Sequence, residues 1–581
     1  MTIDIEDPDA RAPVARAGVS ASLAKIVRTP ILAGILLLAV YVGLSFLNDS
    51  SAYLGTDTGG KIATLDAMRA NDSLHPDVGY WAEQWDPQGR VHPLWYASRW
   101  GNQWVELSTL PVTYAAVPLY NLGGYHLALL LPMLGGVATA FAARSIARRA
   151  RRGCDGWAAF WLVGLASPIV IYSLDFWEHT LGVACLSWAV VAMMNMLDGT
   201  ADDALLRLGR IMGFSALAGL AFGAATTMRT EAFVYALVGT AVPCIVLLRR
   251  RGFGPPLLAG AAAVGGALVP IVANVALERW ALGAVMRADR AGVTASAPGL
   301  GLSERPREAL VMFASPFPSL DASAMIIGAC LVVLLVFIAV RSRSGGDLGP
   351  AKLAAVAVGV IYLVRAVGGL GFVPGLMAAT PIAAVGLALG WRRVSPRIIV
   401  VIALVSLPLV WAFHSLGGVP PQWAGRYILT SGMLLMSVGV AYLPTLQRWT
   451  RRFFIGLAIG VTLFGLAWMS VRTHQMASTQ RVLAARPEPV LISGVAHLVR
   501  EGGSYSELHR WLTAQGHDDQ QFAADVAAKA GVDEFGLVQL RSDGMATPQF
   551  DGWTSTNIDT VTFFDGVDLR VVTYERSAPA E

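Results

Sequence analysis

Long apolar segments alternate with short polar connections from residue 31 to residue 471. Each apolar segment is close to the roughly 20 residues that an α-helix needs to cross a bilayer. The pattern predicts a polytopic α-helical membrane protein with about thirteen transmembrane helices. The expected spans are residues 31–47, 127–143, 157–172, 181–197, 211–228, 232–248, 256–277, 324–340, 353–370, 373–389, 398–413, 428–443 and 453–471.

The composition agrees with this pattern and excludes an ordinary cytosolic enzyme. Of the 581 residues, 55% are hydrophobic and 14% are charged, whereas about 25% of the residues of a soluble domain are charged. The net charge of +4 arises from 44 basic and 40 acidic residues, an excess too small to indicate a nucleic-acid partner. The four cysteines lack the close spacing of a zinc or redox pair.

The distribution of Lys and Arg predicts the topology. Residues 1–29 are polar and basic and lack a signal-peptide cleavage pattern, so we expect a cytoplasmic N-terminal segment. Basic residues then collect on alternate connections, as in 148–152 and 249–251, which the positive-inside rule places in the cytoplasm. With an odd number of spans, all large polar segments are extracytoplasmic. These are the loops 48–126 and 278–323 and the tail 472–581.

The predicted domains are therefore a transmembrane module at residues 30–471 and an extracytoplasmic C-terminal domain at 472–581, in a multi-pass protein of the cytoplasmic membrane. The tail has 15 acidic and 9 basic residues, typical of a solvated module. Its pattern predicts a small α/β domain. We expect a strand at 489–495, helices at 504–515 and 519–530, and strands within 535–574. In the first loop, five tryptophans among polar residues favour packing at the membrane interface: Trp81, Trp85, Trp95, Trp100 and Trp104.

Asp57 is the first candidate for chemistry. It lies about ten residues beyond the first span, in Gly-Thr-Asp-Thr-Gly-Gly, and apolar residues follow at helical spacing. The structural interpretation is a helix cap, which position alone favours. The functional interpretation is a general base near the outer surface, which needs a carboxylate within reach of an acceptor hydroxyl.

Asp175, Glu178 and His179 stand in a connection so short that their charges lie at the membrane boundary. Acids at this depth usually face a protein cavity and have a partner, although solvated acids at the end of a helix pair are an equal alternative. The three groups also suit Mg²⁺ or Mn²⁺, so a metal role stays open.

Arg229 and Glu231 lie between two spans with almost no loop. They are either a local ion pair or a phosphate-binding guanidinium held by a carboxylate. Arg426 and Tyr427 open the twelfth span, where snorkelling and the aromatic belt are the structural alternative. Arg365 lies inside an apolar segment, either as a phosphate contact or as a bond between helices.

Apart from the deeper Arg365, these residues are all predicted on the extracytoplasmic side. Carboxylates and arginines at the membrane boundary suit a substrate with a phosphate head and a lipid tail. The pattern therefore favours lipid-phosphate chemistry.

The sequence resembles the C-type (GT-C) superfamily of integral-membrane glycosyltransferases over most of the membrane region. Thr-Asp-Thr at 56–58 is similar to their first-loop acidic signature. His-Pro-Leu-Trp-Tyr at 92–96 and Pro-Leu-Tyr at 118–120 resemble segments of the protein-mannosyltransferase-like members. Arg-Thr-Glu at 229–231 and Gly-Arg-Tyr at 425–427 resemble the Arg-x-Glu and late Arg-Tyr elements. The order of these elements carries the resemblance, and the tail lacks the Trp-Trp-Asp-type motif of oligosaccharyltransferases.

The resemblance implies transfer of a sugar from a polyprenyl-phosphate donor, with inversion, to a cell-envelope glycan, lipid or protein. Asp57 is expected to be the base, and Arg229, Arg426 and Arg365 to stabilise the phosphate. Glu178, with His179 or Asp175, is expected to orient a substrate, and Glu231 to position Arg229. The Ala- and Arg-rich composition favours a mannosyl or arabinosyl donor, as in a high-GC bacterium.

Three other functions fit a chain with many spans. A flippase or transporter needs charges along a path at the midplane, and only Arg365 is deep. An O-antigen-ligase-like or polymerase-like protein uses Arg and His more than an Asp base. A non-catalytic scaffold would only present the tail. Of these functions, only the glycosyltransferase requires Asp57.

Overall fold

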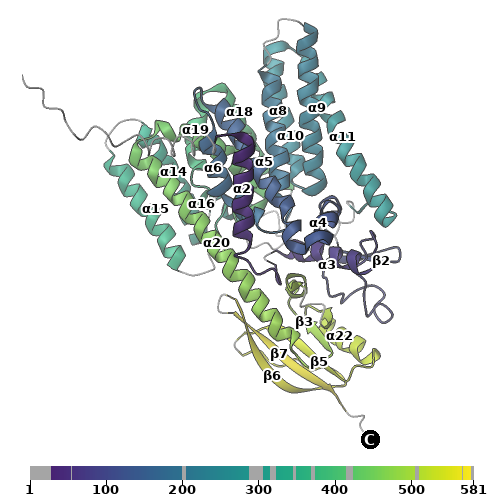
Figure 1. The fold of residues 1–581 in the computed structure, drawn as a ribbon. Helices are drawn as coiled ribbons and strands as arrows, with labels where there is room; N and C mark the ends of the chain where they lie inside the picture. Colours follow the sequence, from purple (N-terminus) through teal and green to yellow (C-terminus); the bar gives the residue numbers. More distant parts are fainter. Residues whose placement is uncertain are drawn as a thin grey trace, which may run out of the picture.

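The computed structural model describes residues 28–53, 55–106, 108–198, 204–286, 305–314, 322–343, 348–367, 373–413, 423–503, 509–542, 544–564 and 567–577. Within these residues, ten helices are long and apolar enough to span a membrane. They run roughly side by side in one bundle (Figure 1). They are α5 (Leu130–Ala150), α8 (His179–Leu197), α9 (Ala204–Met228), α10 (Ala232–Arg251), α11 (Gly254–Leu282), α14 (Ala322–Arg343), α15 (Gly349–Val367), α18 (Val394–Phe413), α19 (Leu429–Tyr442, preceded by the 3₁₀ turn η2, Arg426–Ile428, and followed by η3, Leu443–Thr445) and α20 (Arg448–Ala484).

The other three expected spans are also helical, which confirms a polytopic α-helical membrane protein. The first is the shorter apolar helix α2 (Pro30–Ser45). The other two are each broken before a proline, because proline has no N–H for the preceding turn. The breaks at Pro168 and Pro381 give the pairs α6 (Trp157–Leu165) with α7 (Pro168–Ser173) and α16 (Leu376–Ala379) with α17 (Ala383–Leu389), the latter followed by η1 (Gly390–Arg392).

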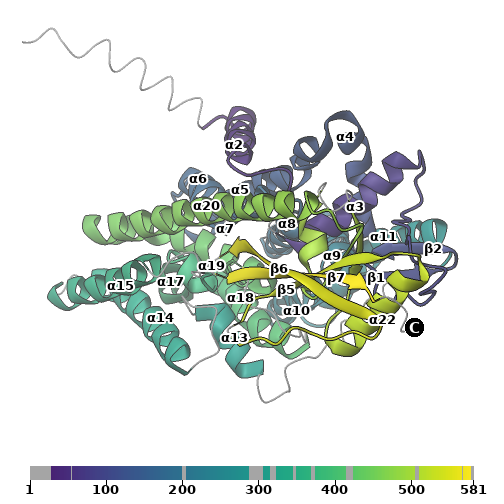
Figure 2. The same cartoon turned by 90° about the horizontal axis from the view of Figure 1, so that it is seen from below.

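The first loop has more structure than its polar sequence suggests. It contains α3 (Thr56–Ala70), a hairpin of β1 (Ala97–Trp100) and β2 (Gln103–Glu106), and α4 (Leu110–Ala128). Helix α4 is kinked at Gly123 and Gly124, and Gly124 has φ 62°, a value that glycine adopts without the steric cost of a side chain. The kink divides α4 into two segments shortly before the membrane helix α5 begins at Leu130. Helix α3 lies between the bundle and the C-terminal sheet (Figures 1 and 2).

The tail folds into a five-stranded mixed sheet, here called the sheet domain (residues 490–576). The strand order is β4-β3-β5-β7-β6. The first three strands are parallel, and β7 and β6 pair antiparallel at one edge. The elements are β3 (Val490–Ser493), α21 (Leu498–Glu501), β4 (Arg510–Thr513), α22 (His517–Lys529), β5 (Glu534–Leu540), β6 (Trp553–Phe564) and β7 (Val567–Arg576). Helix α20 continues from the bundle to this sheet without a break (Figure 1).

The small α/β domain is confirmed, but the helix expected at 504–515 is wrong. Residues 510–513 form β4, which pairs with β3, and Trp511, Leu512 and Thr513 are all buried. Three consecutive buried residues do not fit one face of a helix, whereas a strand buries both faces where its sheet is covered on both sides. Strand β4 is the edge strand, and the first loop covers its outer side, where the Thr513 N–H donates to the carbonyl oxygen of Val91 at 3.1 Å. Residues 504–508 lie outside the described residues.

Three of the five tryptophans of the first loop are placed differently from the expectation. Trp81, Trp85 and Trp104 share one hydrophobic core with the sheet domain, and the Trp81 indole N–H donates to the carbonyl oxygen of Trp511 at 2.9 Å. These three tryptophans fill a protein core, where their large rings bury much apolar area. The first loop and the sheet domain therefore form one layer.

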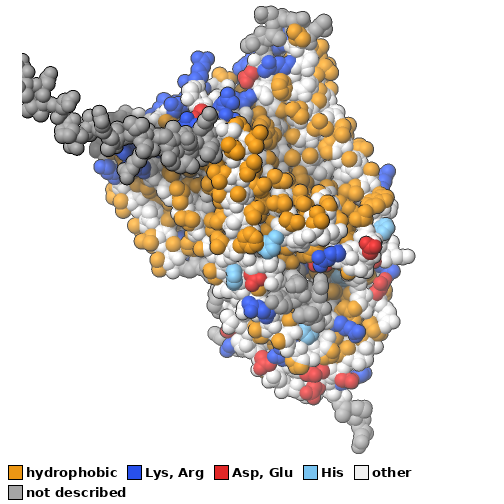
Figure 3. Space-filling model, viewed as in Figure 1, with side chains coloured by type: hydrophobic (Ala, Val, Ile, Leu, Met, Phe, Trp, Pro, Cys, Tyr) orange, Lys and Arg blue, Asp and Glu red, His pale blue; other side chains and the backbone are white. Residues whose placement is uncertain are grey.

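The surface shows two chemically different ends. Hydrophobic side chains cover the sides of the bundle, and Lys and Arg gather at the end away from the sheet domain (Figure 3). Most of the middle loop 278–323 lies outside the described residues, apart from the end of α11 and α13 (Arg305–Ala314). The N-terminal residues 1–27 are outside them as well.

Candidate active site

The site begins at the first turn of α3, which packs unusually closely on its neighbours. A Cβ atom on Gly55 would lie 2.1 Å from the Trp177 ring, and one on Gly59 would lie 1.5 Å from the carbonyl oxygen of Arg500. Contacts below 3.0 Å are not tolerated, so the glycines of Gly-Thr-Asp-Thr-Gly-Gly are needed for this packing. They allow α3 to approach both the bundle and the sheet domain.

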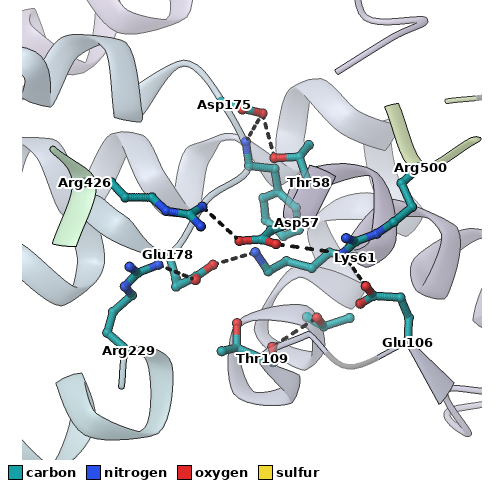
Figure 4. Close-up of polar contacts among 12 residues, drawn as sticks. Asp57, Thr58, Lys61, Glu106, Thr109, Asp175, Glu178, Arg229, Arg426 and Arg500 are labelled. Carbon is teal, nitrogen blue, oxygen red and sulfur yellow. Dashed lines mark hydrogen bonds and ion pairs between the residues drawn. The ribbon is translucent and has the colours of Figure 1, made fainter. Parts of the chain in front are cut away.

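Asp57 lies in that first turn and faces two arginines (Figure 4). Arg426 Nη1 is 3.5 Å from its Oδ2, and Arg500 Nη2 is 3.8 Å from its Oδ1. The residue before the helix is Gly55 and no side chain caps the helix, so the interpretation of Asp57 as a cap is wrong. Burial acts to raise the pKa of Asp57, but Arg426, Lys61 and Arg500 outweigh it and hold the pKa below its usual range. Asp57 is therefore an ionised carboxylate.

Glu178 is the centre of a second group of contacts. Its Oε2 accepts from Lys61 Nζ at 2.5 Å and its Oε1 from Arg229 Nη1 at 3.1 Å. The expected contact of Arg229 with Glu231 is present, with Nε 2.8 Å from Oε1. The side chains of Lys61 and Glu178 are each 1% exposed. Buried charges are costly unless they are paired and hydrogen-bonded, and this network satisfies that condition.

Asp175 closes the group on the bundle side. Its Oδ1 accepts from the Thr58 hydroxyl at 2.7 Å, from the Tyr125 hydroxyl at 3.4 Å and from the Phe176 N–H at 2.8 Å. Burial raises the pKa of Asp175 to about 6, against these hydrogen bonds and the charge of Lys61. Asp175 is thus protonated below about pH 6, whereas Asp57 stays ionised there.

Two predicted aromatic and histidine residues line the same region. The Tyr427 ring lies between two guanidinium groups, 4.5 Å from that of Arg426 and 5.2 Å from that of Arg229. The His179 ring stacks on Tyr172 at 4.8 Å, and neither of its nitrogens has a hydrogen-bond partner among the described residues. His179 is 2% exposed, so it lies inside the group.

Three members were not found from the sequence. Lys61 gave no signal because it is one lysine in a polar helix. Arg500 and Glu106 form an ion pair, and Arg500 also stacks on Tyr96 at 4.8 Å. Arg500 belongs to α21, and 443 residues separate it from Asp57 in the chain, so no local pattern connects them. We call the charged cluster the nine residues Asp57, Lys61, Glu106, Asp175, Glu178, Arg229, Glu231, Arg426 and Arg500.

Arg365 is placed apart from these residues. It belongs to α15, which lies at the edge of the bundle in both views (Figures 1 and 2). The contacts that build the charged cluster do not include it. The sequence therefore identified six members of the charged cluster, together with His179 and Tyr427, which pack on it. It also suggested Arg365, which belongs to another region.

The cluster is a poor fit for a divalent cation. Among the described residues, no three or more His, Cys, Asp or Glu side chains are grouped so that they could hold a metal ion. Glu178, Glu231 and Glu106 are instead each paired with an arginine or lysine. A metal would have to replace these cations as their partner.

No family model matches the chain and no curated protein matches its sequence. Similar solved structures include the oligosaccharyltransferase of Archaeoglobus fulgidus with Zn and sulfate, at 12% identity and a TM-score of 0.47, covering 86% of this chain and 67% of the other. They also include ArnT of Cupriavidus metallidurans bound to undecaprenyl phosphate, at 15% identity and a TM-score of 0.43, covering 94% and 98%. With scores below 0.5, this likeness does not decide a function, which has to come from the site.

Proposed function

We propose that the chain is a membrane glycosyltransferase that moves a hexosyl or pentosyl group from a polyprenyl-phosphate donor to an extracytoplasmic acceptor, with inversion. One observation carries the proposal. The side chain of Asp57 is 26% exposed beside Arg426, whereas those of Glu178, Glu231 and Glu106 are 0–7% exposed. Asp57 is thus an ionised carboxylate that a substrate can reach, next to a guanidinium suited to phosphate.

In the proposed step, an acceptor hydroxyl oxygen attacks the anomeric carbon of the donor sugar. The bond from that carbon to the phosphate oxygen breaks, and polyprenyl phosphate leaves with the electron pair. Asp57 takes the hydroxyl proton as general base. Attack opposite the leaving phosphate inverts the configuration at the anomeric carbon.

Arg426 and Arg229 are proposed to stabilise the charge that develops on the leaving phosphate. The Nε of Arg426 and the Nη2 of Arg229 have no partner among the described residues, so each keeps a donor for a ligand. Glu231 and Glu178 are proposed to act through Arg229, because they hold its Nε and Nη1. His179 and Asp175 are 2% and 1% exposed behind this network, so they are proposed to orient the sugar through it rather than by direct contact. Arg365 has no part in the proposed step.

The proposed sidedness follows from the two ends of the bundle. The exposed charges at the end opposite the sheet domain are mostly Lys and Arg, whereas acidic and basic residues mix around the sheet domain (Figure 3). Exposed Lys and Arg beside the spans favour the cytoplasm. The charged cluster, the first loop and the sheet domain are then extracytoplasmic. The acceptor is a glycan, lipid or protein of the cell envelope.

The test uses purified full-length protein in lipid nanodiscs with a panel of polyprenyl-phosphate sugars, including mannosyl and arabinosyl donors, and membrane-derived acceptors. Release of polyprenyl phosphate and product formation are measured for wild type, Asp57→Asn and Asp198→Asn. Asp198 is a matched control because it is half-exposed beside Arg149 on the far end of α8. We expect Asp57→Asn to lose about 10³-fold in rate and Asp198→Asn to keep wild-type activity.

Each other result contradicts part of the proposal. Equal release by both variants would remove Asp57 as the base. Release from none of the donors, together with movement of the intact donor lipid across the bilayer, would favour a flippase.

A further inference from the structure

A cavity of about 620 Å³ lies on the other side of α3 from Lys61 and Arg426. Its volume is within the range of about 300–1,000 Å³ that is usual for small-molecule sites. Helix α3, the first-loop segment 78–94 and the sheet domain form its walls, together with Tyr53.

Helix α3 separates this cavity from the charged cluster because its two faces carry different residues. Gly59, Ala63 and Ala67 follow one another at four-residue spacing and face the cavity with Asp66, as residues on one face of a helix do. Thr58 and Lys61 lie on the other face and contact Asp175 and Glu178. Small side chains on the cavity face leave room for a ligand.

Arg500 belongs to both compartments. It lines the cavity, and its Nη2 lies 3.8 Å from Asp57 Oδ1. It is 3% exposed, and its Nε and Nη1 have no partner among the described residues. The guanidinium of Arg500 would therefore lie between a ligand in the cavity and Asp57, the proposed base.

The lining indicates the ligand. Trp81 and Trp511 supply large amphipathic rings, and the buried Trp511 Nε1 has no partner among the described residues. Asp66 and Arg69 add a carboxylate and a guanidinium at the wall. A sugar ring suits such a wall, because its C–H face packs on an indole while its hydroxyls bond to charged groups. No lining residue belongs to a candidate membrane span, so the wall offers no path for a lipid tail.

We infer that this cavity is a saccharide subsite that holds the sugar units of the acceptor next to the one that reacts at Asp57. The inference rests on the proposed function and makes it narrower, since the acceptor is then a glycan or a glycan-bearing molecule. Donor and acceptor would approach Asp57 from the two faces of α3.

The test is ligand-observed NMR on the full chain in nanodiscs, without any donor. Maltotriose, a mannotriose and an arabinotriose are the probes. We expect saturable binding of at least one trisaccharide, weakened about tenfold or more in Ala67→Phe, which fills the cavity. Ala261→Phe, on the exposed surface of α11, is the matched control and should bind as wild type does. Trp511→Phe keeps an apolar ring in the core but removes the indole N–H, and should also weaken binding.

Three results would overturn the inference: no saturable binding of any trisaccharide, equal binding by Ala67→Phe and wild type, or displacement of the bound trisaccharide by farnesyl phosphate or by a peptide. The outcome is separable from that of the proposed function. Asp57→Asn should bind trisaccharide normally. Binding without transfer by the wild type would refute the transferase and leave a saccharide site without an acceptor role, whereas transfer without binding would refute only the subsite.

Discussion

The two ends of the helix bundle both carry arginines, but in different states. At the end away from the sheet domain, Arg249 and Arg250 are exposed at the close of α10. At the other end, Arg229 and Arg500 are 8% and 3% exposed and are bonded to carboxylates. An exposed arginine is hydrated, and its position indicates which side of the membrane it faces. A buried, paired arginine has a fixed position and suits the binding of a phosphate. The same residue type thus has a different meaning at each end.

The largest expected effect comes from breaking the buried network at Arg229. Arg229→Ala leaves Glu178 and Glu231 as buried acids without their guanidinium, so we expect a loss of about 3–5 kcal/mol in unfolding free energy and no detectable transfer. Thermal unfolding in nanodiscs measures the loss of unfolding free energy, and the donor assay measures the loss of transfer. Arg250→Ala, at the exposed end, should change stability by less than about 0.5 kcal/mol. Similar shifts in the two variants would refute the contrast between the ends.

Arg426→Lys tests phosphate stabilisation with less structural damage. The pair with Asp57 is partly exposed and 3.5 Å long, so its loss should cost little stability. Lysine lacks the planar fork of arginine, and we expect kcat to fall about 10²-fold. Steady-state kinetics with the active donor decide this, and an unchanged kcat would remove Arg426 from the leaving-group site.

Arg500→Gln tests the contribution of the sheet domain to Asp57. Arg500 helps to hold the pKa of Asp57 low, so its removal should raise that pKa. The base must be ionised to accept a proton, and the acid limb of the rate profile should therefore move to higher pH. Arg500→Lys should restore most of the original profile. An unchanged limb in Arg500→Gln would show that the arginine acts only in packing.

Asp175→Asn should have a smaller effect, with a defined sign. The pKa of Asp175 is raised to about 6 in the folded protein, so its protonated form stabilises the fold at low pH and that contribution is lost as pH rises through 6. Asparagine cannot ionise. We expect the variant to be more stable than wild type by about 1–2 kcal/mol at pH 8 and equal to it near pH 4. Greater stability of the wild type at pH 8 would contradict this assignment.

Removal of divalent cations should have the smallest effect. Four of the five acids of the charged cluster are paired with Lys or Arg, and the fifth, Asp175, accepts hydrogen bonds from neutral groups. EDTA should therefore change transfer by less than about twofold. Assays with and without added Mg²⁺ or Mn²⁺ after EDTA treatment measure this. Restoration of a lost activity by either metal would show that the cluster binds one during turnover.

The membrane helices and the candidate residues near them can be predicted from local features of the sequence. Apolar length and composition are local properties, and helices occupy all thirteen expected segments. Asp175, Glu178, Arg229 and Arg426 were recognised because each stands in or beside an apolar segment, where a charge is costly. That cost acts on one residue at a time and is therefore visible in the sequence.

Which of these residues come into contact depends on the packing of segments that are distant in the chain. Arg500 pairs with Glu106 and reaches Asp57 from a strand-rich tail. Trp81, Trp85 and Trp104 of the first loop pack on that tail. Such contacts join segments about 400 residues apart, and aromatic or charged residues in polar loops suit several environments equally well. Residues 510–513 became a strand because β3 offers them a partner. Pairing and burial depend on what the rest of the chain brings alongside, which no local pattern contains.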